Sequence, residues 1–95
     1  VVSDYVEHLR HMRPDVARLM LRSFFDSDFR ELLPRVGCPV TVLQPARDVA
    51  VPLAVGRFLA RAIPHATLRV LDVTGHLPHL THPAEVSRAL REVLE

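Results

Sequence analysis

The 95-residue sequence contains one cysteine, no tryptophan and, among its twelve basic residues, no lysine. A single cysteine, Cys38, cannot form a disulfide within the chain, which fits a reducing compartment. No apolar run approaches the roughly 20 residues that a transmembrane helix requires, and no basic-then-apolar leader opens the chain. We therefore expect a cytoplasmic protein without a membrane partner. Cys38 itself, beside Pro39, is interpreted as a small buried hydrophobe and not as a reactive thiol.

The chain has almost no excess of charge of either sign, because eleven acidic residues oppose the twelve arginines and leave a formal net charge of +1. A nucleic-acid interface requires a basic face with little acid to oppose it. Four arginines lie near the N-terminus, but acids are interspersed among them: Arg10, Arg13, Arg18 and Arg22 against Asp4, Glu7 and Asp15. The mixing excludes nucleic acid as an expected partner.

Apolar residues make up 48% of the chain, which is typical of a packed globular protein. Helical spacing predicts helices over about 3–11, from Pro14 to about 26, over 52–62, and from Pro83 to about 94. A short helical turn is expected over 29–33, stopped by Pro34. Short apolar runs predict strands over 40–44 and from about Thr67 to 73.

The order strand, helix, strand, helix in the second part predicts a parallel, right-handed βαβα unit. Two strands alone form a marginal sheet, and parallel sheets require cover on both faces. The fold class is therefore α/β, as the edge of a larger sheet and hence an incomplete fold. We expect the isolated chain to be unstable or to aggregate.

An acid and a histidine follow the two predicted strands. Asp48 comes after the first strand and Gly75-His76 after the second. Loops that leave the carboxyl ends of parallel strands share one edge of the sheet, where ligands bind. Asp48 and His76 are thus candidates for the acid and base of a Ser-His-Asp site, in the chain order of α/β-hydrolases.

The nucleophile of such a site is absent from the sequence, because none of the serines (Ser3, Ser23, Ser27 and Ser87) lies in a Gly-x-Ser-x-Gly turn. Other interpretations stay open for the pair. Asp48 could be a turn aspartate bonded to backbone, and His76 a loop histidine packed on Pro78. Asp72, at the end of the second strand, could compete as the acid but ranks below Asp48.

Two further histidines, His79 and His82, continue a His-x-x-His-x-x-His series from His76. Imidazole is a good zinc ligand, but no cysteine lies nearby and prolines interrupt the helix face. We predict no metal site here. Loop packing and hydrogen bonding explain these histidines instead.

Three segments resemble the small α/β-hydrolase group that contains the bacterial regulator RsbQ and the plant strigolactone and karrikin receptors. The acid loop is Gln44-Pro45-Ala46-Arg47-Asp48-Val49-Ala50-Val51-Pro52, and the more specific histidine loop is Gly75-His76-Leu77-Pro78-His79-Leu80-Thr81-His82-Pro83. The third segment is Phe24-Phe25-Asp26-Ser27-Asp28-Phe29-Arg30. The resemblance covers about residues 14–94.

The resemblance implies the C-terminal βαβα part of an α/β-hydrolase, preceded by a cap helix. Residues 1–34 would be cap-derived helices and a connector, and residues 35–95 the strand-helix-strand-helix part of the core. Asp48 and His76 match the family's triad acid and histidine, and no metal or organic cofactor is implied. The implied ligand is a small apolar ester or lactone.

Four apolar residues are assigned to this ligand: Phe24, Phe25, Val49 and Leu77. The two phenylalanines belong to an apolar patch with Met20 and Leu21, for which an ordinary core role is the favoured alternative.

Three functions remain open for the chain. It is part of a serine hydrolase, or part of a hydrolase-derived receptor that binds a signalling protein partner, or a truncated fragment without activity.

Overall fold

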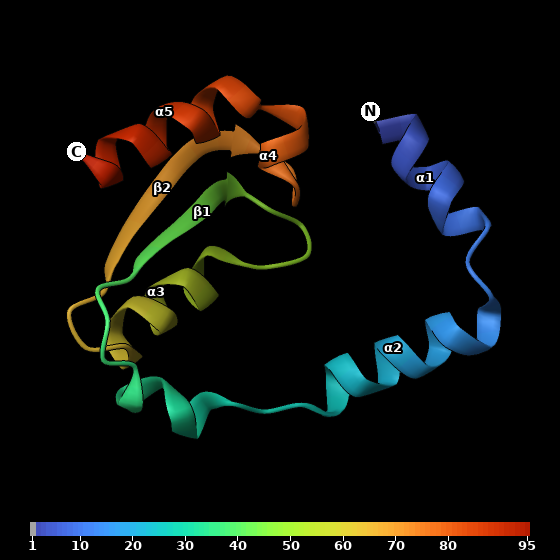
Figure 1. The fold of residues 1–95 in the computed structure, drawn as a ribbon, viewed down its shortest axis with the longest axis horizontal. Helices are drawn as coiled ribbons and strands as arrows, with labels where there is room; N and C mark the ends of the chain where they lie inside the picture. The colour runs from blue at the N-terminus through green and yellow to red at the C-terminus, as the bar shows by residue number, and fades with distance from the viewer. Residues whose placement is uncertain (1) are drawn as a thin grey trace.

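The computed structural model describes residues 2–95. In chain order its elements are α1 (Val2–Arg10), α2 (Pro14–Asp26), the 3₁₀ helix η1 (Arg30–Arg35), β1 (Thr41–Arg47), α3 (Leu53–Ala62), β2 (Thr67–Thr74), α4 (Pro78–Thr81) and α5 (Pro83–Leu94). β1 and β2 pair in parallel, which confirms the predicted βαβα order. Both strands end on the same side of the molecule, next to α4 and the loop after β1 (Figure 1).

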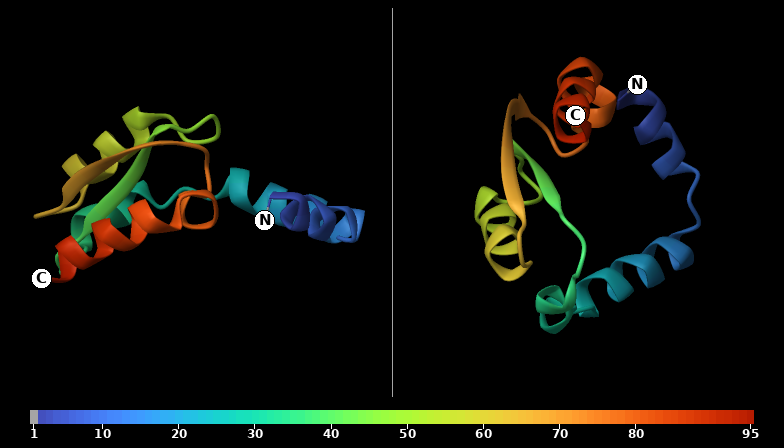
Figure 2. Two further views of the ribbon diagram at one scale, coloured as in Figure 1. Left: turned by 90° about the horizontal axis from the view of Figure 1, so that it is seen from above. Right: turned by 60° about the vertical axis from the view of Figure 1, so that its left-hand side comes forward.

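The sheet lies between two helices, with α3 over one face and α5 toward the other (Figures 1 and 2). α3 packs against both strands, and its buried residue is Gly56. The buried apolar residues among those described are Ile63, Val73 and Ala89. This core is small because only two strands and two helices build it.

α1 and α2 lie apart from the sheet and reach it through η1 (Figure 1). α2 has no buried residue, and its residues Phe24 and Phe25 are 73% and 77% exposed. The interpretation of these side chains as ordinary core is therefore wrong for the described chain, because no other element covers them. The division at residue 34 stays a prediction.

Several local expectations need correction. η1 continues through Pro34 to Arg35, because Val36 still donates to the Leu33 carbonyl and Pro34 removes only its own N–H. Cys38 is exposed, since it lies in the connector before Thr41, where β1 begins. β1 extends to Arg47, three residues beyond the predicted end at Gln44. No helix within residues 2–95 is long and apolar enough to cross a bilayer.

Candidate active site

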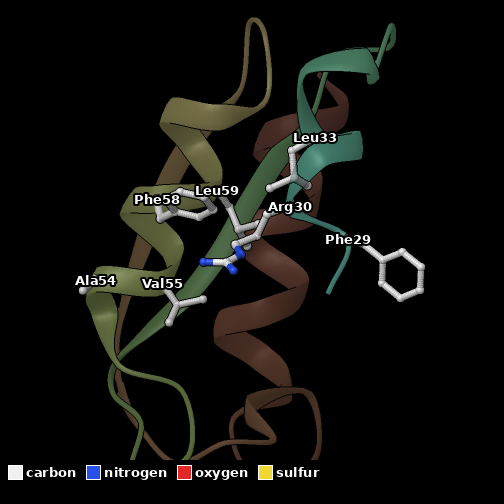
Figure 3. A pocket seen from close by; sticks show the side chains of 7 residues that line it. All are labelled: Phe29, Arg30, Leu33, Ala54, Val55, Phe58 and Leu59. Atoms are coloured by element: carbon white, nitrogen blue, oxygen red, sulfur yellow. The ribbon is translucent and has the colours of Figure 1, made fainter. Parts of the chain in front are cut away.

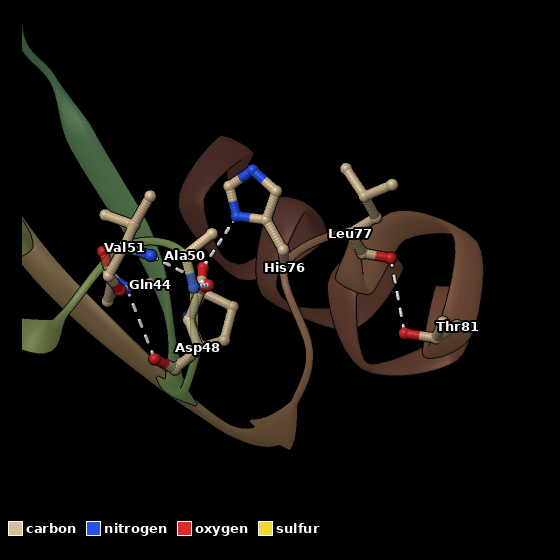
Figure 4. Close-up of polar contacts among 8 residues, drawn as sticks. Gln44, Asp48, Ala50, Val51, His76, Leu77 and Thr81 are labelled. Carbon is tan, nitrogen blue, oxygen red and sulfur yellow. Dashed lines mark hydrogen bonds and ion pairs between the residues drawn. The ribbon is translucent and has the colours of Figure 1, made fainter. Parts of the chain in front are cut away.

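The loop after β1 holds Asp48 by its own backbone. Asp48 Oδ1 accepts hydrogen bonds from the backbone N–H groups of Ala50, at 2.8 Å, and Val51, at 3.0 Å. This is the Asx-type turn expected of an aspartate followed by a tight loop. The turn occupies one carboxylate oxygen and leaves Oδ2 directed at the second loop (Figure 4). The turn interpretation and the candidate acid role are therefore compatible.

The loop after β2 is tied to the end of β1 through Gly75. The Gly75 N–H donates to the Arg47 carbonyl at 2.8 Å, and Gly75 has a φ of +122°. Glycine alone adopts this backbone conformation without strain. The conformation places the next residue, His76, beside the acid loop.

The structure brings the two candidate catalytic side chains together. His76 Nδ1 donates to Asp48 Oδ2 at 3.0 Å (Figure 4). Because an ionised carboxylate only accepts hydrogen bonds, this contact fixes the neutral ring as the Nδ1–H tautomer. Nε2 then carries a free lone pair, and within the described chain no group bonds to it. A histidine held in this way can accept a proton at Nε2.

Burial differs sharply between the two partners. The Asp48 side chain is 3% exposed, whereas that of His76 is 51% exposed. The acid is thus shielded from water beneath the ring, while the ring faces outward. Such a difference in exposure suits a buried acid, Asp48, that orients a base, His76, while the base stays accessible to a further reactant.

The pKa of Asp48 lies below its ordinary value, chiefly because His76 hydrogen-bonds the carboxylate. The backbone N–H groups of Val51 and Ala50 lower it further, and burial acts in the opposite direction. A carboxyl with a lowered pKa stabilises the fold above its ordinary pKa, and this contribution is lost as the pH falls through the lowered value. Asp48 therefore remains charged at neutral pH.

A cavity of about 360 Å³ adjoins the pair. It is lined by both Asp48 and His76, with Gln44, Val51, Leu71 and Val86 among the other walls. The four side chains assigned to the ligand are not among its lining residues.

Their positions in the structure explain why. Val49 is 99% exposed, and Leu77 is half-buried and accepts the Thr81 hydroxyl through its carbonyl. Phe24 and Phe25 lie on α2, away from the sheet. Their roles as ligand contacts stay predictions.

Asp72, the rival acid, pairs with Arg47 and not with His76. The Arg47 guanidinium binds Asp72 at 2.9 Å and the Thr74 hydroxyl at 2.7 Å. The strand pairing is irregular between Pro45 and Arg47, which pair with Leu71 and Thr74, so Asp72 lies within the irregular part of β2. Arg47 thus joins the ends of both strands just before the two loops, and occupies the carboxylate that could have competed with Asp48.

A larger cavity, of about 490 Å³, lies between η1 and α3 and holds neither candidate catalytic residue. Its walls are mainly apolar, from Leu33 of η1 to Val55, Phe58 and Leu59 of α3 (Figure 3). Within residues 2–95 no group of three His, Cys, Asp or Glu side chains could hold a metal ion. His82 Nδ1 instead lies 2.8 Å from the Thr81 hydroxyl.

One residue of the site escaped the sequence analysis. Gln44 is 5% exposed, lines the cavity and donates from Nε2 to the Val51 carbonyl at 3.0 Å. The available signal was a polar amide within an otherwise apolar strand, four positions before the acid. Buried polar groups of this kind are normally hydrogen-bonded.

Comparison with known proteins gives a consistent result. A model of the alpha/beta hydrolase family matches residues 2–89. The chain is 36% identical over 94 residues to "Strigolactone esterase RMS3" of Pisum sativum, covering 98% of this chain and 35% of the relative. It is 36% identical over 83 residues to "Karrikin insensitive 2 receptor CA" of Petunia hybrida, covering 86% and 31%.

A bacterial relative is similarly close. A pimeloyl-(acyl-carrier protein) methyl ester esterase of Chromobacterium violaceum is 36% identical over 89 residues, covering 94% of this chain and 35% of the relative. The solved structure of a hydrolase from Pseudomonas aeruginosa superposes with a TM-score of 0.64 and 29% identity, covering 73% of this chain and 26% of the other. The chain thus spans about a third of the length of the curated relatives it matches. These matches confirm the resemblance and the predicted fold class.

Proposed function

Because the chain belongs to the α/β-hydrolase family, we propose that it contributes the acid, Asp48, and the base, His76, of a Ser-His-Asp triad. The observation that carries this proposal is the 3.0 Å hydrogen bond from His76 Nδ1 to the buried Asp48 carboxylate. The substrate class we propose is a small apolar ester or lactone, in keeping with the esterases among the relatives. The C-terminal βαβα part of a cytoplasmic hydrolase would be the setting.

The chemistry follows from the fixed tautomer. Nε2 of His76 takes the proton of a serine hydroxyl as the oxygen attacks the ester carbonyl. The imidazolium that forms is stabilised by the Asp48 charge, and it then returns the proton to the leaving alcohol. In the second half Nε2 takes a proton from the attacking water and gives it to the serine oxygen as the bond of the acyl-serine breaks and the acid is released. The serine itself would come from a Gly-x-Ser-x-Gly turn, a motif that these 95 residues lack.

Labelling with a fluorophosphonate tests the proposal in the native protein that carries this chain. The probe reacts with a serine only when a base removes the hydroxyl proton. We expect His76→Ala to slow labelling by about 10²–10⁴-fold, the usual contribution of a general base. The matched control is His65→Asn, an exposed histidine in the turn before β2. Its φ of 58° suits asparagine, so labelling at the wild-type rate is expected.

Labelling of His76→Ala at the wild-type rate would contradict the base assignment. A wild-type protein that is not labelled at all would contradict the hydrolase proposal itself. The two results are separable because the first still shows an activated serine and the second does not.

A second candidate function is that of a receptor for an apolar small molecule. It is favoured by the karrikin receptor among the relatives and by the exposed apolar face of α2, which could contact a signalling protein partner. Ligand-dependent binding of a partner would then survive His76→Ala, because no proton transfer is required. If His76→Ala lost both partner binding and fluorophosphonate labelling, the hydrolase would be favoured.

A further inference from the structure

The acid loop is fastened at a second point, beyond the hydrogen bonds that Asp48 itself makes. Val51 donates its N–H to Asp48 Oδ1 at 3.0 Å, and its carbonyl accepts from Gln44 Nε2, also at 3.0 Å. Both polar groups of Val51 are thus engaged, one by the acid and one by β1. The position of Asp48 relative to the strand therefore depends on Gln44.

Gln44 is held in place by a close approach to α3. A Cβ added at Gly56 would lie 2.9 Å from Gln44 Oε1 and 3.3 Å from Gln44 Cβ. Real Cβ atoms essentially never approach another heavy atom within 3.0 Å, so a side chain at position 56 would require the Gln44 carboxamide to shift. Gly56 is buried in α3, where glycine is otherwise less favourable than alanine. The contact explains why that position is glycine.

We propose that Gln44, admitted by Gly56, is a positioning residue that sets the place of the Asp48 carboxylate under His76 through the Val51 backbone. The chain of contacts runs from Gly56 to Gln44, from Gln44 to the Val51 carbonyl, and from the Val51 N–H to Asp48. This inference rests on the proposed function, since it assigns Gln44 a task within the same site. Gln44 touches neither His76 nor a reacting atom in this scheme.

The test compares Gln44→Met, Gly56→Ala and Asp48→Asn in the native protein that carries this chain. Methionine keeps the length of the side chain but cannot donate to the Val51 carbonyl. Alanine at position 56 keeps the donor but displaces it. We expect each of the two to lower kcat by about 10–100-fold with little change in KM, because small misplacements of catalytic groups are costly.

A second readout separates positioning from mere destabilisation. The amount of active protein is counted by its end-point labelling with the fluorophosphonate, and kcat per labelled site should still fall in Gln44→Met. Partial unfolding would reduce the number of labelled sites without lowering kcat per site. In the wild type, slow hydrogen exchange of the Gln44 carboxamide is expected, and this can be measured even where a variant does not fold.

The outcomes separate the positioning role of Gln44 from the proposed triad function on which it rests. Loss of activity in Asp48→Asn, with kcat per labelled site of Gln44→Met within threefold of wild type, would overturn the positioning role alone. Carboxamide exchange as fast as that of a free glutamine would also overturn it. Full activity in Asp48→Asn would overturn the proposed function itself.

Discussion

Replacement of Asp48 by asparagine should lower kcat about 10⁴-fold in the native protein, as the loss of the correct histidine tautomer does in other triads. The acid loop determines this result. Oδ1 of Asp48 accepts two backbone N–H groups, from Ala50 and Val51. In the variant the amide oxygen must stay at that position, because the NH₂ group cannot accept. The NH₂ group is then turned toward His76 Nδ1.

A donor that faces Nδ1 requires that nitrogen to accept, so the ring proton moves to Nε2. Nε2 then cannot take the proton of a serine, and the site loses its base without losing its geometry. Nitrogen NMR of the labelled histidine would show the exchange directly, as an Nδ1–H ring in the wild type and an Nε2–H ring in the variant. Stability should change much less than rate, because the backbone contacts of the loop are retained.

Asp72→Asn is the matched control. Asp72 is almost fully exposed and pairs with Arg47, and exposed ion pairs contribute about 0–1 kcal/mol. We expect its rate to remain within about twofold of wild type, because Asp72 is bound to Arg47 rather than to His76 and the ion pair contributes little. A large loss in Asp72→Asn with none in Asp48→Asn would reverse the assignment of the acid.

The proximity of Asp48 and His76 could be predicted from the sequence because the strands before them could be predicted. Prolines at positions 14, 52 and 83 mark helix starts, and the period of the apolar residues separates helices from strands. Once the strands are parallel, both carboxyl ends must share one edge, and the residues that follow them meet there. The 3.0 Å contact between His76 and Asp48 is a consequence of that topology.

The sequence does not show which element, if any, covers a given face of a helix or strand. Spacing on α2 shows an apolar stripe but not whether anything covers it. The sequence therefore predicts a core or ligand role for Phe24 and Phe25, whereas in the structure both residues are exposed. The approach of Gln44 to Gly56 joins residues that no local pattern relates. α4 was missed because its four residues, Pro78–Thr81, are too short to show a period.

The 95-residue chain, purified alone, is expected to show no cooperative thermal transition as a monomer. Its accessible surface is 7717 Å², whereas a compact protein of its mass exposes about 5,500 Å². Its radius of gyration is 15.6 Å, against about 12 Å for a compact domain of that length. Circular dichroism should show helix content that declines gradually on heating, and gel filtration should show large or mixed species. A sharp, reversible melt of a monomer would contradict this expectation.

Two physical causes could produce that behaviour, and one variant separates them. Phe24 and Phe25 form an edge-to-face pair with centroids 5.6 Å apart, exposed on α2, and such patches promote association. Phe24→Ser with Phe25→Ser should therefore reduce the large species. It should not create a cooperative melt, because the core of two strands and three buried apolar residues among those described is unchanged. If the double variant did melt cooperatively as a monomer, the βαβα unit would be stable by itself, and the apolar helices alone would explain the aggregation.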